Sequence, residues 1–215
     1  MTFLFQSAVI IVTDTIDRLH TTATSHIRVF IIDVMGHKVC CVTLHAGIAG
    51  GADIILLPEI PYDIDVVVEA INKRKAAGKK FTLIPVAEGA ISKEDAKLSK
   101  KELKEKKAKQ KYPSVAYEIS EKIQKKTDQE VRITVPGHTQ RGGPPCAYDR
   151  VLATRLGAAA AEAILDGDFG RLVAVKNRDI ARVPLSEVAG KLKYVDPESD
   201  IVREAKMTGI SFGDK

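Results

Sequence analysis

Apolar residues fall into two kinds of stretch along the chain, and each kind predicts a different element. Short, nearly continuous apolar runs predict strands that are covered on both faces; these runs span 28–34, 52–57, 81–86, 131–135 and 172–175. Longer stretches, with helical spacing clearest in the first, predict helices; these stretches span 7–19, 39–48, 64–77, 115–126, 147–165 and 186–192. Because strands and helices alternate, we expect an α/β fold with a parallel sheet between layers of flanking helices.

Turn-forming residues bound several of these elements. Gly78 and Gly167 are expected to end two of the helices, and Ser114 is a candidate cap for the helix at 115–126. The residues beyond Tyr194 are polar and mixed, and their pattern predicts no element.

Composition narrows the class of protein. The 215 residues are 45% hydrophobic and 28% charged, which is ordinary for a globular protein that buries a sizeable core. No apolar run reaches the length of a membrane span, and residues 3–5 lack the flanks of a signal peptide, so we expect no membrane partner. Cys40, Cys41 and Cys146 are too few, and wrongly spaced, for a disulfide framework or a zinc site. A reducing, cytoplasmic location is therefore expected.

The net charge of +5 comes from one segment. Residues 92–111 hold nine lysines and four acidic residues, and the rest of the chain is balanced. The segment has no aromatic residue on which a base could stack. We therefore interpret residues 91–111 as a lysine-rich surface insertion with a solvated helical face, and we expect no nucleic-acid partner.

Candidate chemistry concentrates at 134–143, where a buried strand ends and a Gly-rich loop begins. His138, Gln140 and Arg141 follow the strand, and Gly142-Gly143 follow them. The carboxyl ends of strands in open α/β sheets bind ligands, adjacent glycines let backbone N–H groups approach an anion, and arginine offers a planar fork. These residues indicate an anion site, with phosphate favoured. The alternative is a tight turn with a solvated arginine, and spacing alone does not decide between the two.

A longer series of motifs resembles the 6-phosphofructokinase family. The matching motifs occur in the family's order and are Val34-Met-Gly36, Leu44-His-Ala-Gly-Ile-Ala-Gly-Gly-Ala-Asp53, Leu57-Pro-Glu-Ile60, Gly137-His-Thr-Gln-Arg-Gly-Gly-Pro-Pro-Cys-Ala-Tyr-Asp-Arg150 and Val151-Leu-Ala-Thr-Arg-Leu-Gly157. The similarity runs from about Thr2 to Leu192 and is nearer to the diphosphate-using or mixed-donor branch. It implies a phosphofructokinase-like, three-layer fold, here incomplete. It also implies the parent reaction of glycolysis, transfer of a phosphoryl group from ATP or diphosphate to fructose 6-phosphate, with Mg²⁺.

The resemblance also assigns roles to residues. Met35 and Gly36 match the segment that packs along the sugar, and Glu59 matches a contact to the fructose ring. His138 and Arg141 match ligands of the 6-phosphate.

Two further arginines and one departure complete the implied substrate site. Arg28 and Arg132 match arginines that a neighbouring subunit donates to the 6-phosphate, so a homo-oligomer is expected. His37 stands where the family has an arginine that contacts substrate. Histidine is shorter than arginine, cannot form a bidentate fork and is only partly charged at neutral pH.

Two family motifs do not occur in the 215 residues. One is the Gly-Gly-Asp-Gly-type loop for the phosphoryl donor and magnesium, and the other is the Thr-Ile-Asp-Asn-Asp-type segment that supplies the catalytic base. The resemblance therefore implies no catalytic residue and no metal ligand in this chain, and Mg²⁺ is not expected to bind to the chain alone.

These observations lead to a domain and function hypothesis. We expect a sugar-phosphate domain at 1–135 and a C-terminal tail at 193–215. Between them, 136–192 would carry the signature loop, helix and strand toward an otherwise missing N-terminal domain. The chain would bind fructose 6-phosphate, would not transfer phosphate alone, and would work as a homo-oligomer or with a separate N-terminal half. The alternatives are a non-catalytic sugar-phosphate-binding or regulatory module, or a remnant without function.

Overall fold

The computed structural model describes residues 4–23, 28–36, 41–108 and 111–215. The chain divides into two compact units. The larger unit contains Val9–Arg141 and Tyr194–Lys215, and the smaller unit contains the start of the chain up to Ala8 together with Gly142–Lys193.

A parallel sheet forms the centre of the larger unit. Its order is β2 (Phe81–Ala87), β1 (Arg28–Val34), β3 (Glu130–Thr134), and both neighbours run parallel to β1. Every residue of β1 after Arg28 is buried, as the continuous apolar run predicted. The expected α/β class with a parallel sheet is confirmed.

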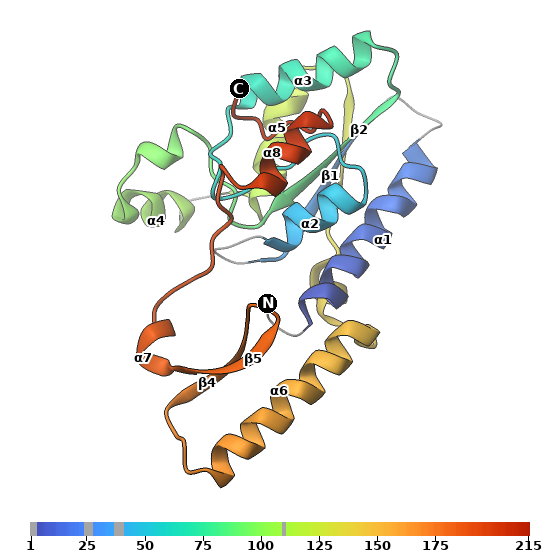
Figure 1. Ribbon diagram of the computed structural model, residues 1–215. Helices are drawn as coiled ribbons and strands as arrows, with labels where there is room; N and C mark the ends of the chain where they lie inside the picture. The colour runs from blue at the N-terminus through green and yellow to red at the C-terminus, as the bar shows by residue number, and fades with distance from the viewer. Residues whose placement is uncertain (1–3, 24–27, 37–40, 109–110) are drawn as a thin grey trace. The chain divides into compact units, whose positions relative to one another are not determined.

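Helices cover both faces of this sheet (Figure 1). Alternate residues of a strand point to opposite faces. On one face, Ile31 of β1 belongs to the core cluster that includes Ile119 of α5 (Val115–Gln124) and Ile71 of α3 (Ile64–Ala76). On the other face, the ring of His20 in α1 (Phe5–Ala23) lies 5.3 Å from the ring of Phe81. The sheet is therefore the middle of three layers.

The helix α2 (Cys41–Ala49) approaches the sheet closely because it carries a glycine. A Cβ atom at Gly47 would lie 2.7 Å from Cδ1 of Ile55 and 3.5 Å from Cγ of Pro85. The contact to Pro85 is an ordinary one, but the contact to Ile55 is too short, so a larger residue at this position would force Ile55 or α2 to shift.

The ends of α3 show how local sequence sets a helix boundary. Asp63 precedes the helix in an extended conformation, and its carboxylate accepts a hydrogen bond from the backbone N–H of Asp65 at 2.9 Å. Gly78 follows the helix with φ +75°, a conformation that favours glycine. Ser114 also occupies the residue before α5, but its hydroxyl makes no capping hydrogen bond, so that part of the prediction is wrong.

The expected continuous strand at 52–57 is wrong. The segment makes isolated bridges instead of a regular ladder, and one of them, Leu56 with Val86, is to β2. The N–H of Leu83 donates to the Asp53 carboxylate at 2.8 Å, and Pro85 has no N–H to donate. The N–H of Leu56 still donates to the Pro85 carbonyl at 3.0 Å. The segment is therefore an irregular fourth member of the sheet.

The C-terminal residues belong to the core of the larger unit. The helix α8 (Asp200–Met207) buries Val202 completely, and Phe212 is 1% exposed. Ser211 bridges Ile54 in parallel orientation. Their apolar side chains are too widely spaced to stand out in a polar segment, which is why the pattern predicted no element there.

The smaller unit joins a helix to a two-stranded hairpin. The helix α6 (Ala147–Leu165) has the predicted bounds. The strand β4 (Arg171–Lys176) pairs antiparallel with β5 (Asp179–Pro184), which the pattern did not predict. Asn177 and Arg178 turn the chain with φ values of 51° and 75°. The helix expected at 186–192 is wrong in extent, because α7 covers only Leu185–Val188 and Gly190 follows with φ +74°.

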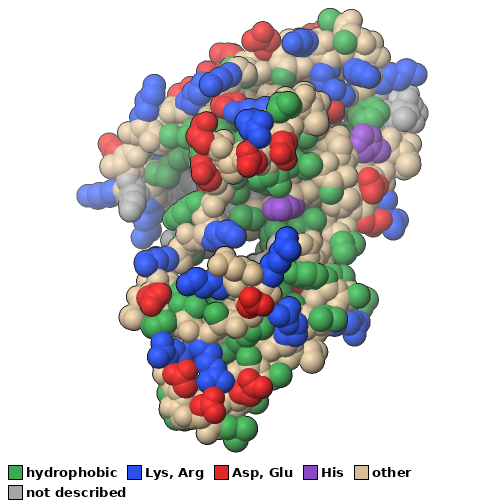
Figure 2. All heavy atoms as spheres, viewed as in Figure 1, with side chains coloured by type: hydrophobic (Ala, Val, Ile, Leu, Met, Phe, Trp, Pro, Cys, Tyr) green, Lys and Arg blue, Asp and Glu red, His purple; other side chains and the backbone are tan. Residues whose placement is uncertain are grey.

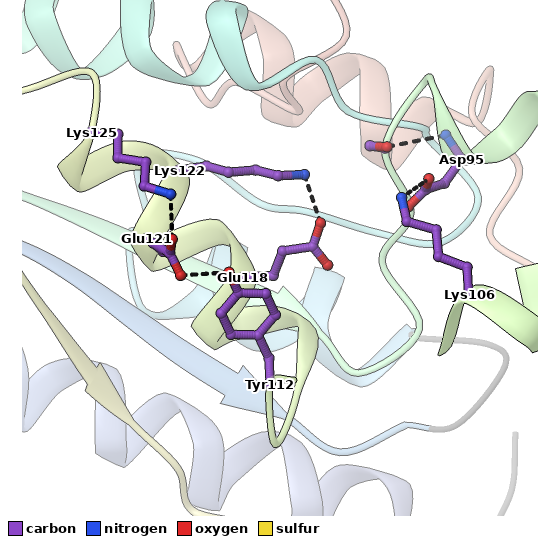
Figure 3. A network of polar contacts seen from close by, with 8 residues as sticks. Asp95, Lys106, Tyr112, Glu118, Glu121, Lys122 and Lys125 are labelled. Atoms are coloured by element: carbon purple, nitrogen blue, oxygen red, sulfur yellow. Dashed lines mark hydrogen bonds and ion pairs between the residues drawn. The ribbon is translucent and has the colours of Figure 1, made fainter. Parts of the chain in front are cut away.

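The lysine-rich segment forms a short helix, α4 (Lys100–Ala108), after a single turn at η1 (Asp95–Lys97). Lys106 of α4 pairs with Asp95, and the hydroxyl of Tyr112 donates to Glu121 in the second half of α5 (Figure 3). Lysine and arginine are interspersed with acidic side chains across the face shown in Figure 2. Among the described residues, no helix has both the length and the apolar character to cross a membrane.

Candidate functional site

The carboxyl edge of the parallel sheet brings two predicted segments together. Met35 and Gly36 follow β1, and the turn η2 (Gly137–Arg141) follows β3. Since β1 and β3 are parallel neighbours, these ends lie at the same edge. His138 and Arg141 are exposed in this turn, and within the described part of the chain their side chains have no hydrogen-bond or ion-pair partner. Both are therefore available to an anion.

A buried amide connects the two segments. Gln140 lies between His138 and Arg141 but is only 4% exposed. Its Nε2 donates to the carbonyl of Met35 at 2.8 Å, and its Oε1 accepts from the N–H of Met35 at 3.1 Å. The turn that carries His138 and Arg141 is thus attached to the backbone that carries Met35 and Gly36.

Carboxylates lie beside the same edge. Glu88 follows β2, and its Oε2 lies 3.4 Å from the backbone N–H of Gly36. Asp33 of β1 is 6% exposed. Burial raises the pKa of Asp33 above its ordinary value, the hydroxyl of Ser114 partly offsets that rise, and the negative charge of Glu88 adds to it. Glu88 is exposed and can contact a ligand there.

Glu59 has a different environment. Its Oε1 accepts a hydrogen bond from the backbone N–H of Val195 at 3.1 Å. Its Oε2 is buried and has no hydrogen-bond partner among the described residues. The carboxylate therefore anchors the returning C-terminal segment, and nothing in the structure tests its predicted contact to a sugar ring.

Arg28 and Arg132 do not join the edge that carries Met35. Arg28 begins β1 and pairs with Glu130 of β3, and Arg132 pairs with the same carboxylate. Seven residues of extended strand separate Arg28 from Met35, which corresponds to roughly 23 Å. Arg28 thus lies at the amino end of the sheet, and Arg132, which lies in the middle of β3 in register with Phe30, pairs with the same carboxylate. His37 lies outside the described residues.

A cavity of about 200 Å³ opens next to Glu88. Its lining includes the polar side chains of Tyr62, Asp95, Lys106 and Glu118, so it carries both acidic and basic groups. No group of three or more His, Cys, Asp or Glu side chains in the described ranges could hold a metal ion. Among the described residues, the magnesium implied by the resemblance therefore has no ligand group of this kind.

The sequence prediction named Gln140 without giving it a role, and it did not name Glu88. Gln140 lies inside the anion-binding stretch, but its role depends on a partner 105 residues away. Glu88 follows directly after the predicted strand at 81–86 and the alanine beyond it, and its place at a strand's carboxyl end was the available signal.

Comparison with known proteins identifies the family of this chain. The family described as Phosphofructokinase matches residues 1–164. The chain belongs to the phosphofructokinase family. The resemblance stated from the motifs is therefore confirmed.

Named relatives of this phosphofructokinase-family chain use two phosphoryl donors. It is 50% identical to the ATP-dependent 6-phosphofructokinase of Spirochaeta thermophila, covering 100% of this chain and 58% of that protein. It is 44% identical to the pyrophosphate–fructose 6-phosphate 1-phosphotransferase of Streptomyces coelicolor, covering 91% of this chain and 57% of that protein. The chain thus spans less than two thirds of the length of these relatives.

Solved phosphofructokinases share the fold. The structure from Saccharomyces cerevisiae matches with a TM-score of 0.69 at 32% identity, covering 84% of this chain and 23% of that one. The pyrophosphate-dependent enzyme from Nitrosospira multiformis matches with a TM-score of 0.72 at 16% identity, covering 93% and 50%. At that identity the second match shows the fold alone. The expected phosphofructokinase-like fold is confirmed.

Proposed function

We propose that this chain binds fructose 6-phosphate as the acceptor side of a 6-phosphofructokinase. The observation that carries the proposal is the exposed pair His138 and Arg141, held by Gln140 against the end of β1. The parent reaction transfers a phosphoryl group from ATP or diphosphate to the sugar in glycolysis. The names of the relatives support that reaction for the family.

The chemistry of the turn suits a phosphate monoester. Arg141 offers a planar fork to two phosphate oxygens, and His138 adds a donor from the same turn. Gly137 has φ +55°, which favours glycine and bends the chain immediately after Pro136. A charged hydrogen bond of this kind contributes about 1.5–3 kcal/mol. The 6-phosphate would therefore dominate binding.

Two carboxylates are candidates to accept hydrogen bonds from the hydroxyls of the sugar ring. Glu59 is the residue predicted from the motif, but one of its oxygens accepts from Val195 and the other is buried. Glu88 is exposed and lies at Gly36. We propose that Glu88, more than Glu59, accepts a hydrogen bond from a hydroxyl of the sugar. Mutation of Glu59 tests the alternative.

The arginines at the other end of the sheet require a second copy. Arg28 and Arg132 converge on one carboxylate, so part of their charge is already balanced. A phosphate carried by a second copy could be contacted by both guanidinium groups at this surface. We therefore propose a homo-oligomer, with an N-terminal half supplied separately as the alternative partner.

The chain alone is proposed to bind substrate without transferring phosphate. In phosphoryl transfer, positioning and neutralisation of the transferred group supply most of the catalysis. The residues identified here address the acceptor sugar. A non-catalytic sugar-phosphate-binding or regulatory module would also bind the sugar phosphate, and mixing the chain with a family N-terminal half distinguishes the two, since only the acceptor half of an enzyme should then produce fructose 1,6-bisphosphate.

Calorimetry with fructose 6-phosphate tests the proposal. We expect measurable binding by the wild-type chain, and a loss of about 1.5–3 kcal/mol in Arg141→Ala. Arg18→Ala is the control, because Arg18 forms an exposed pair with Asp14 on α1 and such pairs contribute little. No binding by the folded wild type, or equal binding by Arg141→Ala, would refute the proposed site.

A further inference from the structure

The ladder between β1 and β3 ends before β1 does. The last β1–β3 pair is Ile32 with Thr134, whereas pairing with β2 continues to Val34 with Ala87. Pro136 then removes a backbone donor as the chain leaves β3. The chain at Met35, directly after β1, therefore lacks a strand partner on the β3 side, and its backbone N–H and C=O groups need other partners.

The amide of Gln140 supplies those partners. It donates to the Met35 carbonyl at 2.8 Å and accepts from the Met35 N–H at 3.1 Å, which reproduces both bonds of a strand pair. The orientation of the amide is fixed, because a flipped amide would place two donors, and two acceptors, against each other. At 4% exposure this pair is shielded from water.

The geometry has a consequence for the residues on either side. His138 and Arg141 are exposed and have no partner of their own in the described chain. Their distance from Met35 and Gly36 therefore depends on how the turn is attached. Gln140 is the side chain in that turn which reaches across 105 residues to hold it.

We propose that Gln140 is a positioning residue, which fixes His138 and Arg141 at the spacing from Met35 and Gly36 that one sugar phosphate needs. This inference rests on the proposed function of the edge. The side chain acts through the backbone of Met35 and does not itself contact the ligand. Removing the Gln140 amide should loosen the turn without removing the side chain of His138 or of Arg141.

A matched pair of substitutions tests this role. Gln140→Met keeps the size of the side chain and removes both bonds. Gln129→Met is the control, because Gln129 is also buried, at 6% exposure, but directly precedes the amino end of β3. We expect fructose 6-phosphate to bind about tenfold more weakly to Gln140→Met, which is 1.4 kcal/mol, and within about twofold of wild type to Gln129→Met.

Inorganic phosphate gives a readout that a general loss of stability would not produce. It needs His138 and Arg141 but not their spacing from Gly36. We expect Gln140→Met to bind inorganic phosphate within about twofold of wild type while it loses affinity for fructose 6-phosphate. Amide hydrogen exchange should also become faster at Met35 in this variant and stay unchanged at Ile31 in the middle of β1.

Gln140→Glu adds a rescue by pH. A neutral carboxylic acid has one donor and one acceptor, like the amide, whereas the carboxylate has no donor for the Met35 carbonyl. Relative to wild type at the same pH, this variant should recover affinity for fructose 6-phosphate as the pH falls through the pKa of the new carboxyl.

The outcomes separate the two claims. If folded wild type does not bind fructose 6-phosphate, the proposed function fails, and this inference fails with it. If wild type binds and Gln140→Met binds equally well, the function stands and the positioning role is refuted. An equal loss for inorganic phosphate and fructose 6-phosphate would also refute it, because it would indicate general damage to the turn.

Discussion

Asp149 offers the most direct test of how the smaller unit is held together. It lies in the first turn of α6 and is 1% exposed. Its Oδ2 accepts hydrogen bonds from the N–H of Ser7 at 2.8 Å and from the hydroxyl of Ser7 at 2.6 Å. The same hydroxyl accepts from the N–H of Cys146 at 2.9 Å. Ser7 and Asp149 thus join the amino ends of α1 and α6.

The magnitude follows from these contacts. A hydrogen bond to a charged acceptor contributes about 1.5–3 kcal/mol, and bonds that share one atom do not add fully. Asp149→Ala also leaves the buried N–H of Ser7 without a partner. We therefore expect Asp149→Ala to lower the free energy of unfolding by about 2–4 kcal/mol and Ser7→Ala by about 1–2 kcal/mol. The double variant should show a coupling of about 1 kcal/mol or more.

Urea unfolding followed by circular dichroism measures these losses, since the chain has no tryptophan. The two units can unfold in separate transitions, so the data should be fitted for both. Asp168→Ala is a control within the same unit, because Asp168 is more exposed and forms surface ion pairs with Arg171 and Arg182. A loss below about 0.5 kcal/mol in Asp149→Ala, or a coupling of zero, would refute the reasoning.

The dependence on pH gives the same idea a second test. Desolvation raises the pKa of Asp149, but hydrogen bonds from Ser7 and Cys146 outweigh it and hold the pKa below its ordinary value. Its stabilisation is therefore present above the pKa of the unfolded chain and is lost as the pH falls through the lower pKa of the folded chain. The difference in stability between wild type and Asp149→Ala should shrink in that acidic range.

Two further predictions concern the larger unit. Because burial raises the pKa of Asp33, its contribution to stability is present below the pKa of the unfolded carboxyl and is lost as the pH rises through the folded value. Asp33→Asn should therefore gain stability relative to wild type as the pH rises above about 4, and a constant difference across urea titrations at several pH values would contradict this. Sedimentation should show that the chain self-associates at micromolar concentration, with Arg28→Ala weakening both association and binding of fructose 6-phosphate. A clean monomer that binds the sugar phosphate as tightly as its Arg28→Ala variant would oppose the second-copy proposal.

The regular core was predictable because burial on two faces leaves a continuous apolar signal. β1 has the bounds that its sequence predicted, and so does α6. The segment at 52–57 carries the same signal, yet the Asp53 carboxylate and the missing N–H of Pro85 interrupt its ladder. An apolar run predicts burial, but it does not indicate whether the neighbouring strand can complete the hydrogen bonds of a ladder.

The C-terminal segment and β5 were missed for a related reason. Val202 and Phe212 are buried, but polar residues surround them in the sequence. In β5, Ile180 and Val183 are only partly buried, and no side of the hairpin shows a long apolar run. Isolated buried residues form no pattern in the sequence, so their burial can be recognised only when the element that packs against them is known.

The candidate site divides in the same way between local and long-range information. His138 and Arg141 could be predicted from the sequence as candidate anion ligands, because a strand end followed by a Gly-rich turn is a local pattern. Gln140 and Glu88 depend on contacts with Met35 and Gly36 across 105 and 52 residues. Glu59 was predicted to contact the sugar ring from a local motif, but a long-range contact gives it another partner. Its Oε1 accepts a hydrogen bond from the N–H of Val195, 136 residues away in the returning C-terminal segment.

The position of the arginines along the sheet constrains how any sugar-phosphate site could be completed. Residues at one edge of a parallel sheet can meet on one ligand, and residues at opposite edges cannot. His138, Arg141 and Glu88 share the carboxyl edge, whereas Arg28 opens β1 and shares Glu130 with Arg132. If His138, Arg141, Arg28 and Arg132 all bind one phosphate, the first two and the last two must come from different copies. The stoichiometry of binding and the assembly state are therefore linked quantities, and neither can be interpreted without the other.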